Sequence, residues 1–292
     1  MKFIKFLSLY SLFIVHLLFF NASSAHGTHV IGSRSAGFFS DFLLALNHLI
    51  WCERNNITPI VYWDHNSLYY SPKGYHHATN AWEYYFEPVS TVPYNPKEII
   101  HNGYSAPDNT TIITGKGNFT AHFLPEVRQE VYQLMQKYIH VKSVVQKKVD
   151  AFYKKHMEGK PTVGVHIRRT DNYISIHVGL EEYIKRLQDF PNHQILVCTD
   201  DYQALAYMKE KFGKRVIYCN VYRSHDGSPV HHHGKHSKPL LGEEILMEVL
   251  LLARCDLFVH AISNVVCGVL FFNPMIPNIF IDPRDYGIVS LE

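Results

Sequence analysis

The chain has 292 residues, of which 47% are hydrophobic and 18% charged, a balance typical of a globular protein with a sizeable apolar core. Its 28 basic and 26 acidic residues leave a formal net charge of +2, which excludes the strongly basic field of a general nucleic-acid-binding protein. Five cysteines, an odd number without a C-x-x-C pair, do not indicate a disulfide framework.

The first 25 residues are typical of a targeting segment. Lys2 and Lys5 lie at the start of an apolar run at 3–20, and small residues follow it. The pattern predicts a cleaved signal peptide or an uncleaved signal anchor, and its length leaves both open. The body of the protein is then expected in the lumen of the secretory pathway (ER or Golgi) or outside the cell, touching a membrane only through this segment. Four N-x-S/T sequons agree with that location: Asn21, Asn56, Asn109 and Asn118.

A strand–helix–strand unit is expected directly after this segment. Apolar runs at 29–32 and 58–63 predict two strands. Between them, residues 40–53 place apolar side chains three or four positions apart and predict an amphipathic helix, with Ser40 as its cap. The unit indicates a parallel arrangement of strands in the first half of the chain.

The stretch 64–110 is rich in aromatic residues, contains proline and has no regular period. A connection of this length is usually functional. Its aromatic rings are suited to stacking on sugars, although filling a core is the commoner use of such residues. From 127 to 152 apolar residues recur every three or four positions, which predicts one long amphipathic helix, or two, ending near 159–161.

In the second half of the chain, strands and helices alternate. The predicted strands are 162–168, 194–199, 215–219, 257–260 and 278–281. The predicted helices are near 180–189, 201–212, 242–254 and 263–272. This alternation predicts a parallel, doubly wound sheet. The predicted fold class is therefore α/β, with two Rossmann-like domains, residues 26–158 and 159–292, and a cleft between them.

Charged residues follow the first strand of the second half. The apolar run V-G-V-H-I ends in Arg168 and Arg169, with Asp171 two positions later. In an open α/β sheet, ligands bind beyond the carboxyl ends of the strands, and the planar guanidinium group is suited to phosphate. The pair therefore predicts a site for a phosphate-bearing ligand such as a nucleotide or nucleotide sugar. On local grounds, structural ion pairs with Asp171 or a neighbouring acid are an equal alternative.

Two further strands end in polar residues just before a helix. Asp200 and Asp201 follow the strand at 194–199, where they either line the same crevice or cap the next helix. Ser263 and Asn264 begin a helix, and a helix N-terminus binds phosphate through its unpaired N–H groups. A simple Ser or Asn cap is equally compatible with the local sequence.

An acid lies inside a helix that is apolar almost all round. Glu248 falls within the run E-I-L-M-E-V-L-L-L, and burying an unpaired charge is costly, so it needs partners. A carboxylate suits the N1–H and exocyclic amine of guanine; the alternative is pairing with a buried Arg or Lys. Glu244, one turn earlier, is a competing candidate.

Several histidines gather in the polar loop 222–240. The loop has no cysteine or second ligand cluster at a fixed spacing, so solvated histidines are favoured over a metal site. The chain also lacks the G-x-S-x-G, H-E-x-x-H and G-x-x-x-x-G-K-[ST] motifs.

Taken in order, four motifs resemble the fucosyltransferase superfamily of α-1,6-, nodulation-type, α-1,2- and protein O-fucosyltransferases. They are G-V-H-I-R-R-T-D, C-T-D-D, the buried helix with its acid, and S-N-V-V, all within residues 160–272. The segment S-R-S-A-G-F-F-S-D-F near the start of the chain is a looser match. The resemblance implies a GT-B-like fold, GDP-fucose as donor substrate, inversion at the anomeric carbon, and no metal or other cofactor.

The resemblance also implies roles for single residues. Arg168 would be the main contact to the β-phosphate, with Arg169 in support. His166 and Glu248 would lie at the guanosine end of the donor. The remaining donor-binding residues would be Asp200, Asp201, Ser263 and Asn264.

The catalytic region departs from the α-1,6 members of the family. Those members have Lys directly after R-R-T-D and a Glu soon after it, whereas this chain has Asn172 and then Y-I-S-I-H with no acid. The departure argues against an α-1,6 linkage. It leaves the general base open between Asp171, His177 and Asp41.

The sequence therefore predicts an inverting glycosyltransferase that moves L-fucose from GDP-fucose to a glycan or glycoconjugate, with no nucleic-acid partner. Arg168, Arg169 and Asp171 are the predicted catalytic residues. Two alternatives remain: the same fold with another nucleotide sugar, and a non-catalytic glycan- or nucleotide-binding protein.

Overall fold

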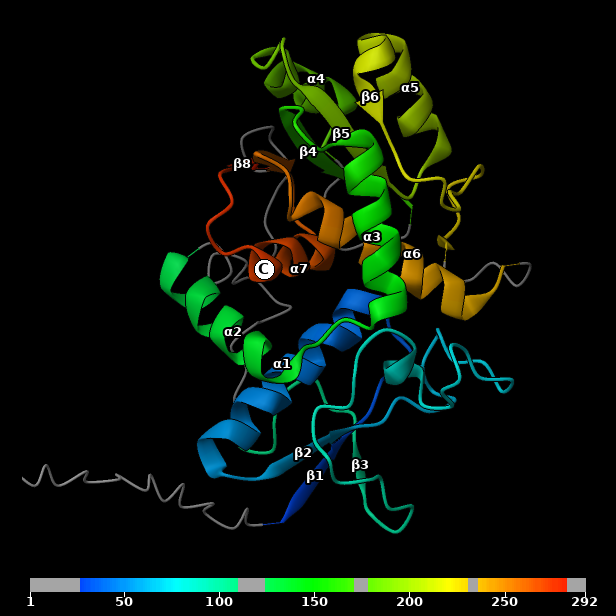
Figure 1. Ribbon diagram of the computed structural model, residues 1–292, viewed down its shortest axis with the longest axis vertical. Helices are drawn as coiled ribbons and strands as arrows, with labels where there is room; N and C mark the ends of the chain where they lie inside the picture. The colour runs from blue at the N-terminus through cyan, green and yellow to red at the C-terminus, as the bar shows by residue number, and fades with distance from the viewer. Residues whose placement is uncertain (1–26, 110–123, 171–177, 231–235, 283–292) are drawn as a thin grey trace, which may run out of the picture.

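The computed structural model describes residues 27–109, 124–170, 178–230 and 236–282, so the expected targeting segment lies outside it. Within these ranges no helix is long and apolar enough to cross a membrane. The described chain forms a small parallel sheet from its first half and a larger one from its second half, with helices between and around them (Figure 1).

The first sheet has the strand order β2-β1-β3. β1 (Thr28–Ile31) leads into α1 (Phe38–Asn55), and β2 (Thr58–Val61) returns parallel to β1, which confirms the predicted strand–helix–strand unit. β3 (Ile100–His101) pairs with the other edge of β1. It has no counterpart in the sequence prediction, because two residues are too few to show a strand period.

The second sheet is parallel, with the strand order β6-β5-β4-β7-β8. Its strands are β4 (Thr162–Ile167), β5 (Gln194–Thr199), β6 (Val216–Ile217), β7 (Leu257–His260) and β8 (Asn278–Phe280). The helices between them are α4 (Leu180–Gln188), α5 (Tyr202–Phe212), α6 (Lys238–Leu252) and α7 (Asn264–Phe272). The chain runs outward from β4 to β6 and then returns to the other side of β4 as β7. This order confirms the predicted doubly wound sheet and makes the β4–β7 boundary the switch point where a ligand crevice is expected.

β4 occupies the middle of this sheet, and every one of its residues is buried. A strand covered by helices on both faces needs a continuous apolar run, as V-G-V-H-I provides. At Gly164 an added Cβ would lie 2.8 Å from Leu252 Cδ2 and 2.9 Å from Cys255 Sγ. The end of α6 therefore packs directly on the backbone of β4, which fixes this helix relative to the strand that leads to Arg168.

The long amphipathic pattern forms two helices, one of the two predicted alternatives. They are α2 (Pro125–Tyr138) and α3 (Ser143–His156). α2 packs on α1 and α7, and α3 packs on α6 (Figure 1). Both helices precede β4 in the sequence, yet they cover helices that belong to the second sheet.

One apolar core joins the two halves of the molecule. Trp63, Trp82 and the run 84–86 are fully buried in it, so most of the aromatic stretch fills the core rather than forming a surface. α1 and α7 meet closely inside it: a Cβ at Gly268 would lie 2.3 Å from Phe39 Cε1. Burial of one such aromatic side chain stabilises the fold by about 2–3 kcal/mol.

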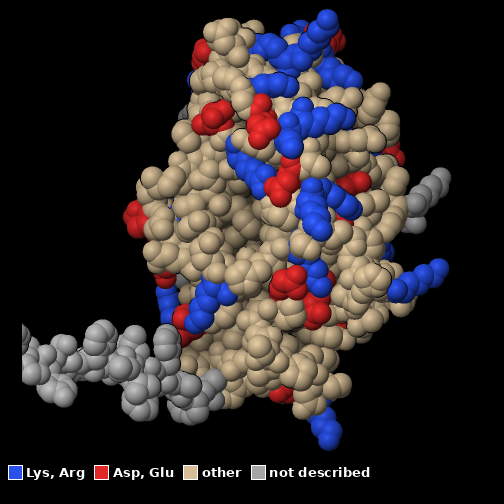
Figure 2. Space-filling model, viewed as in Figure 1, with Lys and Arg blue, Asp and Glu red and all other residues tan. Residues whose placement is uncertain are grey.

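Charges of both signs are mixed on the surface. On the face shown in Figure 2, lysine and arginine side chains gather along α3 and the elements beyond it, with acidic side chains between them. No field of a single sign covers this face, in agreement with the net charge of +2.

α6 begins four residues earlier than predicted, at Lys238 instead of residue 242. Pro239 lies in its first turn, where proline is favoured because the N–H it lacks would have no partner within the helix. The earlier start places the helix N-terminus beside the aromatic stretch, where Tyr85 Oη donates to the Pro239 carbonyl at 3.0 Å.

Three histidine rings stack between α1 and the first sheet: His48 lies on α1, His29 on β1 and His101 on β3. The ring centroid of His29 lies 5.1 Å from that of His48 and 4.2 Å from that of His101. His48 Nε2 donates to the Gly103 carbonyl (2.8 Å), so its Nδ1 accepts from His29 Nε2 (2.8 Å). Burial, with His101 and His48 nearby, lowers the pKa of His29 to about 3, and burial lowers the pKa of His48. The stack therefore requires neutral rings at His29 and His48.

Acid is expected to weaken the fold through this stack. Because the folded pKa of His29 lies below the unfolded value, its stabilisation is complete above about pH 6.5 and is lost as the pH falls below it. His29 should therefore lower the free energy of unfolding by about 2 kcal/mol at pH 5 relative to pH 7. Urea unfolding at the two pH values measures this difference.

His29→Gln should remove this contribution, because its amide can still donate to His48 but cannot titrate. His65→Gln is the matched control, since His65 is 78% exposed, and should retain it. An equal loss of stability at pH 5 in the wild type and the His29 variant would contradict the interpretation.

Candidate functional site

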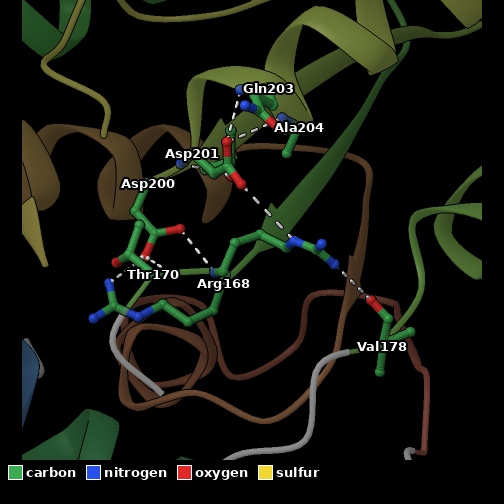
Figure 3. A network of polar contacts seen from close by, with 9 residues as sticks. Arg168, Thr170, Val178, Asp200, Asp201, Gln203 and Ala204 are labelled. Carbon is green, nitrogen blue, oxygen red and sulfur yellow. Dashed lines mark hydrogen bonds and ion pairs between the residues drawn. The ribbon is translucent and has the colours of Figure 1, made fainter. Parts of the chain in front are cut away.

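Asp200 organises the turn that follows β4. Its carboxylate accepts from the backbone N–H groups of Arg169 (2.9 Å) and Thr170 (3.2 Å) and from the Thr170 hydroxyl (2.7 Å). The same group forms an ion pair with Arg168, whose Nη1 lies 2.9 Å from Asp200 Oδ2 (Figure 3). The end of β5 thereby fixes both the backbone after β4 and the direction of the Arg168 guanidinium.

A pocket opens next to this ion pair, beyond the carboxyl edge of the second sheet. Four predicted site residues line it together: His166, Arg168, Asp200 and Glu248. The rest of its wall is Tyr69, Thr199, Val221, Tyr222, Val230, Leu241, Glu244 and Ile245. Residues from β4, β5, α6, the loop after β6 and the aromatic stretch thus meet at one point. Tyr69 is the contribution of the first half of the chain, and its Oη also accepts from the Phe38 N–H at 2.9 Å.

The acid inside α6 is buried, as predicted, and has a basic partner. Glu248 is 4% exposed, and its Oε1 accepts from Arg223 Nη2 at 3.2 Å. Burial raises the pKa of Glu248 to about 8; Arg223 opposes this effect, and the charges of Glu244 and Asp200 add to it. Burial also raises the pKa of Glu244, whose Oε2 accepts from the Tyr222 N–H at 3.2 Å. Both predicted acids therefore face this pocket.

His166 is neutral in this setting. Burial lowers its pKa to about 3; Arg168 and His260 lower it further, while Asp200 acts in the opposite direction. A neutral imidazole offers one donor and one acceptor, so His166 can hydrogen-bond a polar ligand without adding charge to the pocket.

Arg169 and Asp201 lie away from the pocket wall. Arg169 Nη1 donates to the Val178 carbonyl at 3.4 Å, and its Nε lies 3.9 Å from Asp201 Oδ2. Asp201 caps α5, accepting from the N–H groups of Gln203 (2.6 Å) and Ala204 (3.3 Å), as Figure 3 shows. The two consecutive arginines are therefore held by different partners, and only Arg168 reaches the pocket.

Ser263 and Asn264 begin α7 beyond the carboxyl end of β7. Ser263 is the cap residue, and its Oγ accepts from the Val265 N–H at 3.2 Å. Neither residue belongs to the pocket wall. Their part in donor binding stays a prediction.

The candidates for the general base are separated. Asp171 and His177 lie outside the described residues. Asp41 is fully buried on α1, where burial raises its pKa to about 7 against the effect of Arg34. Its Oδ1 accepts from the Arg34 N–H at 3.3 Å, while Oδ2 has no hydrogen-bond partner among the described residues.

The sequence prediction missed Tyr69, which lines the pocket, and Arg223, which pairs with Glu248 behind its wall. Tyr69 lies in the aromatic stretch, where nothing distinguishes it from its buried neighbours, and Arg223 is an isolated basic residue in a polar loop. Only the predicted need of Glu248 for a buried partner points toward Arg223, and it does not identify the residue.

In the described part of the chain, no group of three or more His, Cys, Asp or Glu side chains is arranged to hold a metal. Of the loop histidines, 231–233 lie outside the described residues, His225 stacks on Tyr202 with a centroid distance of 4.3 Å, and His236 packs on Tyr222 at 3.7 Å. The described members of this loop therefore make aromatic contacts.

Solved structures share this fold. The α-1,6-fucosyltransferase NodZ soaked with GDP-fucose has a TM-score of 0.54 and 17% identity, over 85% of this chain and 93% of NodZ. NodZ from Bradyrhizobium has a TM-score of 0.53 and 17% identity, over 87% of this chain and 94% of NodZ. POFUT1 in complex with GDP has a TM-score of 0.51 and 11% identity, over 89% of this chain and 99% of POFUT1. At these identities the similarity is one of fold, and it confirms the GT-B-like α/β architecture.

Comparison of the sequence with known protein families identifies the family of this chain. No curated protein matches the chain in sequence. Residues 122–273, just over half of the chain, match the family described as "Alpha-(1,6)-fucosyltransferase N- and catalytic domains". The protein therefore belongs to the α-(1,6)-fucosyltransferase family and is a glycosyltransferase.

Proposed function

We propose that the protein transfers L-fucose from GDP-fucose to a glycan or glycoconjugate, with inversion at the anomeric carbon. The observation that carries the proposal is the pocket beyond the carboxyl ends of β4 and β5, which combines Arg168, Asp200, His166 and Glu248. The fold supports it, because the similar structures include NodZ soaked with GDP-fucose and POFUT1 in complex with GDP.

Arg168 is the proposed contact to the β-phosphate. When the bond to fucose breaks, negative charge develops on the β-phosphate oxygen of the departing GDP. A guanidinium already oriented by Asp200 stabilises that charge without reorganising during the reaction. Asp200 acts on the donor through Arg168 and through the turn it holds in place.

Glu248 is the proposed reader of guanine. Its ionised carboxylate accepts hydrogen bonds from the N1–H and exocyclic amine of the base, and the neutral His166 supplies a further polar contact. Glu244 lines the same wall and stays the competing candidate.

An inverting transfer also needs a base that takes the proton from the acceptor hydroxyl on the face opposite GDP. Asp171, His177 and Asp41 remain the candidates. Because Asn172 stands where α-1,6 members have Lys, we restrict the proposal to fucosyl transfer and leave the linkage to experiment.

The halves of the chain receive different proposed roles. Residues 159–292 supply all of the pocket wall except Tyr69, so they would hold the donor, and residues 26–158 would hold the acceptor. A location in the secretory pathway is part of the proposal, resting on the sequence of residues 1–25. The sequons Asn56 and Asn109 are exposed, as glycosylation requires.

Replacing Arg168 should strongly reduce transfer. Arg168→Ala removes the charge opposite the leaving group, and we expect kcat to fall by at least about 100-fold. Arg168→Lys, which keeps the charge but loses the planar fork of donors, should recover only part of it. Release of GDP, measured with a panel of nucleotide sugars and glycan acceptors, gives the rate.

Arg169→Ala is the matched control, because its side chain contacts Val178 and Asp201 instead of the pocket, and it should cost less than about tenfold. Undiminished transfer by a folded Arg168→Ala protein would refute the assignment. Release of UDP instead of GDP would favour the alternative donor. Binding of GDP-fucose without transfer to any acceptor would favour the non-catalytic alternative.

The affinity for GDP should rise with pH up to about 8. Guanine donates to the carboxylate, so it favours ionised Glu248, whose pKa is raised to about 8; below that value affinity should fall by up to about tenfold per pH unit. Glu248→Gln cannot titrate and should flatten the profile. Calorimetric titration with GDP between pH 6.5 and 9 measures the effect.

Glu244→Gln is the companion variant and should keep a titrating profile, with its inflection moved to lower pH because the charge of Glu244 no longer raises the pKa of Glu248. If it flattens the profile while Glu248→Gln does not, Glu244 is the acid that reads the base. Inosine diphosphate, which lacks the exocyclic amine, should bind the wild type more weakly than GDP.

A further inference from the structure

A buried arginine lies behind the pocket wall and does not line it. Arg223 is 5% exposed and belongs to the loop after β6. Its Nη1 donates to the carbonyls of Cys219 and Val221, both at 3.1 Å, and its Nη2 donates to Glu248 Oε1 at 3.2 Å. Its Nε is buried without a hydrogen-bond partner among the described residues. A buried guanidinium with one unsatisfied N–H is costly, so stability alone explains this arginine poorly.

The loop that carries Arg223 also forms the wall of the pocket. Val221 and Tyr222 line it, and the Tyr222 N–H donates to Glu244. The Ser224 N–H donates to the Asp200 carbonyl at 2.8 Å, which ties the loop to the end of β5. Arg223 therefore joins α6 to a loop that touches both ends of the predicted donor site.

Arg223 is also the cation that balances the charge of Glu248. The titratable and charged groups that interact with Glu248 are Glu244 on α6, Asp200 and Cys198 at the end of β5, and Cys219 and Arg223 on the loop. Among these groups Arg223 is the one that favours ionisation of Glu248, and burial opposes it. Without this cation the pKa of the carboxyl would rise further, and its protonated form could not accept from both N–H groups of a guanine edge.

We propose that Arg223 is a positioning residue that favours the ionised form of Glu248 and orients it for guanine, and that couples its orientation to the pocket wall formed by Val221 and Tyr222. The inference rests on the proposed function, because it assigns Glu248 to the base of a guanine nucleotide. Arg223 acts through Glu248 and the loop, without touching the nucleotide.

The test is the pH profile of GDP binding to the full chain. Arg223→Met should shift the inflection of the profile upward by at least about one pH unit, because removal of the cation raises the pKa of Glu248. Affinity for GDP at pH 7.5 should fall at least about tenfold and should recover in part as the pH rises. Arg223→Lys keeps the charge and should keep the inflection, while losing affinity because one ammonium cannot replace the fork of donors.

A double variant separates positioning from general damage. With Glu248→Gln already present, Arg223→Met should cost little further affinity, because no carboxylate remains to be balanced. Arg215→Met is the matched control: Arg215 also donates to two carbonyls, those of His193 (2.8 Å) and Phe190 (2.6 Å), at the other end of β6. It should leave the pH profile unchanged.

Each outcome separates the two proposals. If the wild type does not bind GDP, or Glu248→Gln leaves GDP binding and its pH profile unchanged, the proposed function fails. Two results would overturn the role of Arg223 in a wild type that binds GDP as expected. One is an Arg223→Met protein whose pH profile keeps the inflection of the wild type. The other is a loss of GDP affinity from Arg223→Met that simply adds to the loss from Glu248→Gln. Should Arg223→Met not fold, two other measurements test the role of Arg223: the inflection of the pH profile of Arg223→Lys, and the affinity of the double variant for GDP.

Discussion

The pocket depends first on the carboxylate of Asp200. β4 ends in the middle of the sheet, where the chain must turn away and leave backbone N–H groups that need acceptors. Asp200 accepts from two of them and from the Thr170 hydroxyl, and pairs with Arg168 at the same time. One acid on β5 therefore satisfies the turn after β4 and orients the arginine that the turn delivers. The ion-pair alternative for Arg168 is thus realised, and it is also what prepares the guanidinium for an anionic ligand.

A second constraint is the close packing of α6 on β4, which fixes the pocket acids relative to Arg168. α6 carries Glu244 and Glu248, and its far end packs on Gly164 of β4 so closely that no side chain fits between them. α1 and α7 are joined in the same way at Gly268. Helix positions set by backbone contact leave little freedom to slide, because cores are packed to the density of crystals. The distance between Glu248 and Arg168 is therefore a property of the core.

The predictable part of the site is the part fixed by topology. Parallel strands end at a common edge, so polar residues after β4 and β5 had to meet, and the order of strand and helix in the sequence was enough to place Arg168 and Asp200 together. Glu248 was identifiable because an acid in an apolar helix must be buried with a partner. The partner was not identifiable: Arg223 lies in a loop without periodicity. Nor could sequence tell that Asp201 and Ser263 serve as helix caps, because the same residues at a helix start suit a cap and an anion site alike.

The charges of the pocket also favour one orientation of a bound nucleotide. Glu244 and Glu248 lie on α6, whereas Arg168 lies at the end of β4, with the neutral His166 on the same strand. A nucleotide diphosphate has the opposite polarity, since guanine presents N–H donors at one end and the diphosphate carries negative charge at the other. In the reverse orientation, phosphate would face the buried carboxyl group of Glu248 and the half-buried one of Glu244, and like charges in such a site are strongly unfavourable. Under the proposed function, the same acids that select the base would therefore also direct the scissile bond toward the end of β4, where the chain continues into Asp171.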